Sequence, residues 1–320
     1  MIQLLTKKMR EVSIMNKSKA LKSGDKVAIV SLSSGMLGEE FCSHNIAIGG
    51  DDTYRLLPYL LEDEGFVEAV KKHPKLFTGF SDTTINHLML YKLGLSTFYG
   101  PNFICDLGEI ANDMLPYTKK AFEGYLEGNE VKEILASDVW YEEREDFSRN
   151  AIGTDRVVHK EQRGFELLQG KAKFQGRLLG GCLESFYDIL EGTRYDEEIE
   201  TCRKYGLFPT IEEWKDKILF IETCEEKPTP ELFRKELSAL KKQGIFNVIS
   251  GIIVGKPQDE TYYEEYKKIY PEVIENKELP ILYNVNFGHA TPRCALPYGA
   301  DVLVDAVGKR IVILESPFET

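Results

Sequence analysis

The sequence predicts an α/β fold in which buried, mostly parallel strands alternate with helices. The first observation is a set of short runs rich in apolar residues, as expected for parallel strands covered on both faces. These runs are Lys26–Leu32, Leu76–Phe80, Lys217–Glu222, Asn247–Gly255 and Pro280–Asn286. The second observation is that helical patterns follow several of the runs. The third is a polar stretch over residues 136–165 without clear periodicity, which separates two alternating regions.

We expect two domains, because a chain of 320 residues can bury one large core or two medium cores. Residues 1–22 contain several Lys and Arg residues and are expected to form a disordered basic leader without the features of a signal peptide. Residues 23–135 then form the N-terminal domain and residues 136–170 a linker and active-site loop. Residues 171–320 form the C-terminal domain.

Composition and charge exclude several classes of protein. The net charge of −12 argues against a nucleic-acid partner, which normally meets a basic face. No apolar run reaches the roughly 18 residues of a membrane-spanning helix, so we expect no membrane partner. The six cysteines show no CxxC spacing, which predicts reduced thiols in a cytoplasmic protein and no zinc site.

The N-terminal elements begin with the strand at Lys26–Leu32. A second strand ends in the double-glycine turn Gly49-Gly50-Asp51, and a helix begins near Thr53. Only 13 residues separate Leu32 from Ile46, and they have no helical period, although a parallel crossover usually contains a helix. The sequence therefore predicts either a loop in place of that helix or a missing unit.

The next strand, Leu76–Phe80, leads through a tight turn at Ser81 into a helix over Thr83–Lys92 with apolar residues on one face. Gly94 ends this helix, and Leu95–Pro101 form a further strand and turn. The alternation predicts an open, mostly parallel sheet that continues to about residue 130.

The C-terminal elements begin with Phe174–Cys182 and a helix over Leu183–Leu190. After the strand Lys217–Glu222, the run Thr229-Pro230-Glu231 is typical of a helix start, with a cap, a first-turn proline and an acid. The remaining predicted elements are the strands Asn247–Gly255 and Pro280–Asn286 and a β-hairpin formed by Val302–Asp305 and Ile311–Leu314.

Three side chains that suit nucleophilic catalysis follow predicted strands: Ser81, Glu222 and His289. Open α/β sheets place their active sites in loops at the carboxyl ends of strands. The order of serine, acid and histidine is also that of one hydrolase fold. Each residue has a simpler interpretation as well, namely a helix N-cap, a strand-end ion pair and a histidine that satisfies backbone groups. The pattern alone leaves both interpretations open.

Other residues are candidates for binding. The backbone N–H of Asp82 follows the serine and can face an oxyanion, and the Gly49-Gly50 turn can bring further amides to an anion. Trp140 and Tyr141 can stack on an aromatic ligand, although a role in the core fits equally.

With these residues in place, the sequence resembles the LD-carboxypeptidase family of serine peptidases, and within it the branch of microcin C self-immunity peptidases. The resemblance runs in order through most of the chain. The matching stretches are KVAIVSLSSGMLGEEFCSH (26–44), IGGDDTYRLLPYL (48–60), GFSDTTINHLMLYKLGLSTFYGP (79–101), LLGGCLESF (178–186), ILFIETCEEKPTPE (218–231), IIVGKPQDETYYEEY (252–266) and NVNFGHATP (284–292).

The resemblance implies a flavodoxin-like N-terminal domain, a mixed α/β C-terminal domain, a site between them and a homodimer. It implies that Ser81 is the nucleophile, that His289 is the general base and then the acid, and that Glu222 orients His289. Backbone amides of Asp82 and of the turn that contains Gly50 and Asp51 would form the oxyanion hole. No metal or organic cofactor is implied.

The family that the sequence resembles has two branches with different substrates. One branch removes terminal D-alanine from murein tetrapeptides, and the immunity branch cleaves the amide that joins an aminoacyl or peptidyl group to a modified adenylate. The GGDDT turn and the VWYEER segment favour the second branch. Trp140 or Tyr141 would then stack on the nucleobase, and Arg55 would contact a phosphate or carboxylate unless it forms a surface ion pair.

The chain departs from the family between His44-Asn45 and Ile46, where a helix–strand–helix unit is expected and is missing. Such a loss would leave a gap or an open edge in the sheet and would weaken the support of the GGDDT turn. An inactive ligand-binding homologue is therefore an alternative to an active hydrolase.

Overall fold

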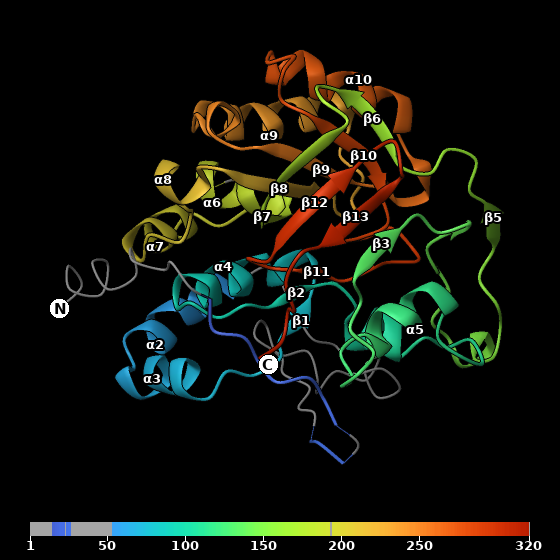
Figure 1. Cartoon of the computed structure of the whole chain (residues 1–320), viewed down its shortest axis with the longest axis horizontal. Helices are drawn as coiled ribbons and strands as arrows, with labels where there is room; N and C mark the ends of the chain where they lie inside the picture. The colour runs from blue at the N-terminus through green and yellow to red at the C-terminus, as the bar shows by residue number, and fades with distance from the viewer. Residues whose placement is uncertain (1–14, 23, 27–52, 193, 320) are drawn as a thin grey trace.

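The computed structural model describes residues 15–22, 24–26, 53–192 and 194–319, which form two sheets, a two-stranded ribbon and the helices packed on them (Figure 1). The larger sheet has eight strands in the order β3-β13-β12-β7-β8-β9-β10-β6. These strands are β3 (Glu133–Leu135), β6 (Glu166–Gln169), β7 (Lys173–Cys182), β8 (Lys217–Glu222), β9 (Gly251–Gly255), β10 (Ile281–Val285), β12 (Asp301–Asp305) and β13 (Arg310–Ile313). The predicted mixed α/β fold is confirmed.

The centre of the larger sheet is parallel and buried. β7, β8, β9 and β10 pair in parallel, whereas β6, β12, β13 and β3 pair antiparallel at the two edges. All residues of β9 and β10 are buried, which explains their continuous apolar runs. The predicted start of β9 at Asn247 is wrong, because Ile245–Asn247 form a 3₁₀ turn and the strand begins at Gly251.

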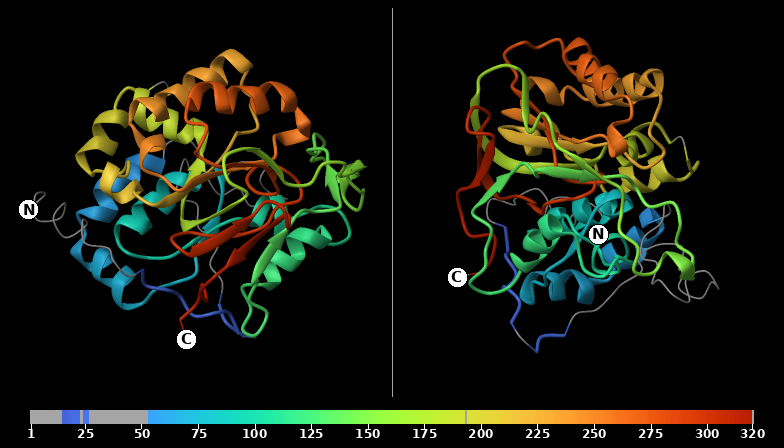
Figure 2. Two further views of the ribbon diagram at one scale, coloured as in Figure 1. Left: turned by 45° about the horizontal axis from the view of Figure 1, so that its top comes forward. Right: turned by 90° about the vertical axis from the view of Figure 1, so that its right-hand side faces the viewer.

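Helices lie on both sides of this sheet, and Figure 2 shows the yellow to orange ones on the side opposite the blue to teal N-terminal elements. The helices are α2 (Leu57–Leu61), α3 (Glu64–Lys72), α4 (Thr84–Lys92), α5 (Pro116–Glu123), α6 (Leu183–Glu191), α7 (Glu198–Lys204), α8 (Ile211–Trp214), α9 (Pro230–Lys242) and α10 (Tyr263–Ile274). α9 begins as predicted, because the Thr229 side chain accepts a hydrogen bond from the Leu232 backbone N–H.

The smaller sheet carries the turn that contains Ser81. It consists of β1 (Thr78–Gly79), β2 (Phe98–Tyr99) and β11 (Leu296–Pro297), with β1 and β2 parallel. α4 was expected to bury one face, yet every residue from Thr84 to Lys92 is buried, because the helix packs beneath β7. A 3₁₀ turn at Ser81–Thr83 precedes it.

The two sheets exchange strands between distant parts of the chain. β3 comes from the N-terminal region but pairs with β13 of the larger sheet, whereas β11 comes from the C-terminal region and pairs with β2. Within residues 136–170, where no regular structure was expected, β4 (Val139–Tyr141) and β5 (Val158–Lys160) form an antiparallel ribbon. β6 from the same stretch joins β10. The domain boundaries at residues 135 and 170 stay predictions.

Part of the predicted leader belongs to the folded body. The Asn16 backbone N–H donates to Gly94 O, and the Leu21 backbone N–H donates to Tyr125 O. Lys17 Nζ lies 2.9 Å from Glu315 Oε2. The expectation of disorder is therefore wrong for residues 15–22, because their backbone forms hydrogen bonds with Gly94 and Tyr125 of the folded body.

Several predicted features lie outside the described residues. They are the strand at Lys26–Leu32 beyond its first residue, the Gly49-Gly50-Asp51 turn and the expected missing unit near Ile46. In the part of the chain that the structure describes, no helix has the length and apolar character to cross a membrane.

Candidate active site

Ser81 lies in the turn between β1 and α4 and has a backbone conformation that serine rarely adopts. Its φ is +63°, and such a conformation costs on the order of 1–3 kcal/mol, so it persists only where its surroundings hold it. The Thr84 hydroxyl donates to Ser81 O at 2.7 Å, and the Thr83 hydroxyl donates to Phe80 O at 2.8 Å. A Cβ on Gly79 would lie 2.9 Å from Thr83 Oγ1, so glycine permits this tight turn. These features are those of a nucleophile elbow.

Glu222 and His289 meet beyond the carboxyl ends of β8 and β10, two parallel strands that lie on either side of β9. Glu222 ends β8, and His289 lies in the loop after β10. Glu222 Oε2 lies 2.7 Å from His289 Nδ1 and accepts the His289 backbone N–H at 3.0 Å. Both side chains are buried. The carboxylate fixes the ring with a proton on Nδ1 and leaves Nε2 for proton transfer.

Gly288 provides the space that the Glu222 carboxylate occupies. Its φ is +72°, and a Cβ there would lie 2.2 Å from Glu222 Cδ. We expect Gly288→Ala to lower the free energy of unfolding by about 2–5 kcal/mol, from backbone strain plus overpacking, and to remove most turnover. Denaturant titration and an activity assay measure both effects.

The matched control for this variant is Gly206→Ala. Gly206 has φ +59° with no atom within 4 Å of the added Cβ. It should therefore lose only the backbone contribution of about 1–2 kcal/mol and keep its turnover. Equal destabilisation and equal turnover in the two variants would contradict the packing argument.

The Tyr99 hydroxyl connects the Ser81 turn to Glu222. It accepts the Ser81 backbone N–H at 2.9 Å and donates to Glu222 Oε1 at 2.6 Å. Tyr99 is fully buried at the end of β2, and burial raises the pKa of its hydroxyl well above the ordinary value. The hydroxyl therefore keeps its proton and stays a donor to Glu222 across the working pH range.

We expect Tyr99→Phe to lower kcat by about tenfold to a hundredfold, because it removes a hydrogen bond to a buried carboxylate and leaves the Ser81 N–H unpaired. The unshielded carboxylate should hold the His289 proton more tightly, so the acid limb of the pH–rate profile should move to higher pH. Tyr283→Phe is the control, because Tyr283 is equally buried and donates to the distant Tyr263 O at 3.0 Å. A Tyr99→Phe profile identical to that of the control would refute the positioning role.

The second nitrogen of His289 contacts Glu225 and not Ser81. The Phe80 ring, which precedes the nucleophile, meets the His289 ring edge-on with centroids 5.1 Å apart. His289 Nε2 lies 2.8 Å from Glu225 Oε2. The hydrogen bonds among the described residues include none between Ser81 Oγ and His289. The structure thus unites Glu222 with His289 and places Ser81 beside them, with Glu225 on the nitrogen that would receive the serine proton.

Two carboxylates stabilise the protonated, positively charged form of His289. Burial disfavours the imidazolium, but Glu222 and then Glu225 outweigh it and raise the pKa of His289 well above its ordinary value. The hydrogen bond to His289 in turn lowers the pKa of Glu225 to about 2. These shifts favour an ion pair between His289 and Glu225, and a protonated imidazole cannot act as a general base.

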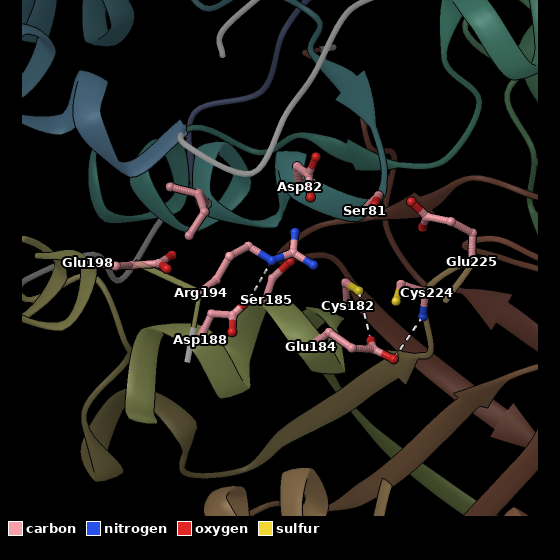
Figure 3. Close-up of a pocket in the computed structure, with 11 residues that line it drawn as sticks. Ser81, Asp82, Cys182, Glu184, Ser185, Asp188, Arg194, Glu198, Cys224 and Glu225 are labelled. Carbon is pink, nitrogen blue, oxygen red and sulfur yellow. Dashed lines mark hydrogen bonds and ion pairs between the residues drawn. The ribbon is translucent and has the colours of Figure 1, made fainter. Parts of the chain in front are cut away.

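Ser81 lines a small pocket that is rich in carboxylates (Figure 3). Its lining residues are Ser81, Asp82, Ile85, Cys182, Glu184, Ser185, Asp188, Arg194, Glu198, Cys224 and Glu225. The free space is about 30 Å³, which is room for about one water molecule. Glu184 accepts hydrogen bonds from Cys182 Sγ and the Cys224 backbone N–H, and burial raises its pKa to about 7. The described side chains therefore leave little room for a substrate group beside Ser81 in this pocket.

The predicted aromatic contacts lie on the ribbon and not in this pocket. The Trp140 ring stacks on His159, with centroids 4.2 Å apart and an interplanar angle of 16°. The Tyr141 backbone N–H donates to Thr291 O at 2.8 Å. This hydrogen bond attaches the ribbon to the loop that contains His289. Trp140 therefore already has an aromatic partner, and Tyr141 contributes a backbone contact.

Of the other expected binding residues, one lines the pocket, two are not described by the structure and one forms an ion pair. Asp82 follows the nucleophile in the turn and lines the pocket, whereas Gly50 and Asp51 lie outside the described residues. Arg55 is half-exposed and lies 3.8 Å from Glu197, as the surface ion-pair interpretation predicted. It also packs over the Tyr195 ring at 5.2 Å.

Sequence reasoning missed two residues of this site. In the sequence, Tyr99 is an aromatic residue at the end of a predicted strand, and nothing in a single sequence indicates its hydrogen bond to Glu222. Glu225 had a weak signal, because it follows Glu222 by three positions in the loop where the catalytic acid was expected.

Two family models match the chain. The LD-carboxypeptidase N-terminal domain matches residues 44–100, and the LD-carboxypeptidase C-terminal domain matches residues 175–304. Ser81 lies in the first matched region, and Glu222 and His289 lie in the second.

The chain is similar to MccF and to an MccF-like protein. An MccF-like protein from Streptococcus pneumoniae, solved in complex with AMP, is 45% identical with a TM-score of 0.85, over 89% of this chain and 97% of that chain. The microcin C7 self-immunity protein MccF of Escherichia coli is 29% identical over 279 residues, which are 85% of this chain and 74% of MccF. A structure of MccF in complex with aspartyl sulfamoyl adenosine is 28% identical with a TM-score of 0.68, over 85% of this chain and 75% of that chain.

Proposed function

Because the chain belongs to the LD-carboxypeptidase family of serine peptidases, we propose that it hydrolyses an amide bond through an acyl-enzyme on Ser81. The observation that carries the proposal is the buried pair of Glu222 and His289 beside the strained turn of Ser81. Nucleophile, base and orienting acid then come from the ends of three separate strands, as the residues of other serine hydrolases come from separate parts of the chain.

In the first half-reaction, Ser81 Oγ attacks the carbonyl carbon of the substrate while His289 Nε2 takes the hydroxyl proton. The carbon–nitrogen bond then breaks, and His289 returns that proton to the leaving nitrogen. In the second half-reaction, His289 takes a proton from water, and the hydroxide oxygen bonds to the acyl carbon. The Ser81 oxygen leaves with the proton from His289, which releases a carboxylic acid and restores the free enzyme.

Two groups assist these steps. Glu222 balances the imidazolium that forms twice in the cycle, and Tyr99 holds Glu222 and the nucleophile turn together. The backbone N–H of Asp82 and an amide of the turn with Gly50 and Asp51 would bind the oxyanion.

We assign the substrate to the aminoacyl- or peptidyl-nucleotide class. The similarity to an MccF-like protein with bound AMP and to MccF with bound aspartyl sulfamoyl adenosine supports this assignment. The attachment of the β4–β5 ribbon next to Thr291 supports a nucleotide position near Trp140 and Tyr141. Murein tetrapeptide is the alternative substrate, because both matching family models describe LD-carboxypeptidases.

A competition assay tests the substrate assignment. The enzyme receives an aminoacyl sulfamoyl adenosine and a murein tetrapeptide together, and mass spectrometry follows both products. We expect the nucleotide compound to be cleaved first. Preferred release of D-alanine would reassign the enzyme to murein trimming, and the absence of both products together with no labelling by a fluorophosphonate would favour the inactive ligand-binding homologue.

The proposal also covers the oligomeric state and the cellular location of the protein. A homodimer in the cytoplasm fits a peptidase that acts on small nucleotide-linked compounds. Light scattering of the purified protein gives the mass of the assembly directly.

A further inference from the structure

We propose that Glu225 selects substrates with a free α-ammonium group, because it exchanges its contact with His289 for that group when an aminoacyl substrate binds. The inference rests on the proposed function and names a chemical requirement of its substrate. It concerns a residue next to the catalytic groups that has no role in the reaction steps above.

The first argument is the position of Glu225. Its carboxylate lies 2.8 Å from His289 Nε2, and it lines the same pocket as Ser81 (Figure 3). Its side chain is 63% exposed, in the loop that follows β8. An exposed side chain on a loop can leave its partner without repacking the core, whereas the buried Glu222 cannot.

The second argument is that the contact must break before catalysis. His289 Nε2 must be unprotonated and must face Ser81 to take the hydroxyl proton. In the free enzyme it faces Glu225, and the two carboxylates on opposite ring nitrogens favour the protonated ring. Turnover therefore requires that Glu225 leave His289 Nε2, and a cation close to Ser81 would offset the loss of this ion pair.

The third argument is the geometry of an aminoacyl substrate. Its α-nitrogen is two bonds from the carbonyl carbon, so it lies about 2.5 Å from the atom that Ser81 attacks. A free α-ammonium group is therefore within a few bond lengths of Ser81 in any productive pose. Glu225 is the carboxylate that both lines this pocket and contacts His289 Nε2.

The fourth argument is the charge of the pocket. Its lining includes five carboxylates, those of Asp82, Glu184, Asp188, Glu198 and Glu225, and Arg194 is the one Lys or Arg among these lining residues. Arg194 lies 3.6 Å from Asp188 and 3.3 Å from Glu226, so its charge is shared with two acids. Such surroundings favour an acyl group that carries positive charge.

The test compares alanyl sulfamoyl adenosine with its N-acetyl derivative, which lacks the ammonium group. For the wild-type enzyme, kcat/KM should favour the free amine by about tenfold to a hundredfold. Glu225→Gln keeps the shape of the side chain and removes its charge, so this preference should fall to about threefold or less. Glu231→Gln is the control, because Glu231 is an exposed acid in the first turn of α9, away from the pocket, and should keep the wild-type preference.

A binding experiment separates this inference from the proposed function. Calorimetry on Ser81→Ala and on Ser81→Ala/Glu225→Gln measures the affinity of both compounds without turnover. A preference for the free amine that disappears with Glu225→Gln supports the inference even if the wild-type enzyme forms no acyl-enzyme, a result that would overturn the proposed function alone. Equal affinities in the Ser81→Ala protein, an unchanged preference in the double variant, or no binding of either compound would overturn the inference.

Discussion

Replacement of Ser81 by alanine should lower turnover by about 10⁶-fold, because the attacking oxygen is lost while the binding groups stay in place. The turn itself should survive, since the Thr84 hydroxyl contacts Ser81 O and the Tyr99 hydroxyl contacts the Ser81 N–H, both of which are backbone groups. Steady-state assays of the aminoacyl sulfamoyl adenosine give the rate. Mass spectrometry after a fluorophosphonate gives the site of labelling.

The control is Ser238→Ala on α9. Ser238 donates to Arg234 O within its own helix and should retain full turnover and full labelling. If the Ser81→Ala protein still carried a covalent label or hydrolysed the substrate at a rate close to wild type, another residue would be the nucleophile.

Replacement of Glu222 by glutamine is the second large effect, with an expected loss of about 10⁴-fold in kcat, by analogy with the aspartate of other serine peptidase triads. The amide occupies the same space but carries no charge to balance the imidazolium. Burial and Glu222 act in opposite directions on the pKa of His289, so loss of the Glu222 charge should lower that pKa. The acid limb of the pH–rate profile should therefore move to lower pH, opposite to the shift expected for Tyr99→Phe.

Glu236→Gln is a matched control for a buried acid. Glu236 is buried in α9, and burial raises its pKa to about 9, so it is protonated at neutral pH. Glutamine then replaces a neutral group of the same shape, and both rate and pH profile should stay close to wild type. A comparable rate loss in the two variants would show that burial of glutamine, and not loss of the triad charge, causes the effect.

The sequence was informative where local patterns determine structure. The buried strand before Glu222 and the capped start of α9 were predicted because apolar runs and capping residues act over a few positions. The strand ends made Glu222 and His289 candidates, and the resemblance to the family, not the pattern, implied that the two side chains interact. The roles of these side chains in the reaction stay a proposal.

What the sequence did not predict depends on contacts between distant residues. β4, β5 and β6 are only three or four residues long, and pairing partners, not composition, make them strands. The complete burial of α4 follows from the β7 strand packed on it, which no periodicity can reveal. Tyr99 and Glu225 owe their importance to partners 123 and 64 positions away, namely Glu222 and His289.

The exchange of β3 and β11 between the two sheets limits how the molecule can move. A hinge that swung the nucleophile turn away from Glu222 and His289 would have to break the pairing of β11 with β2 and of β3 with β13. Ser81, Glu222 and His289 are thus held by sheets that contain strands from both halves of the chain, and removal of either half would leave unpaired sheet edges.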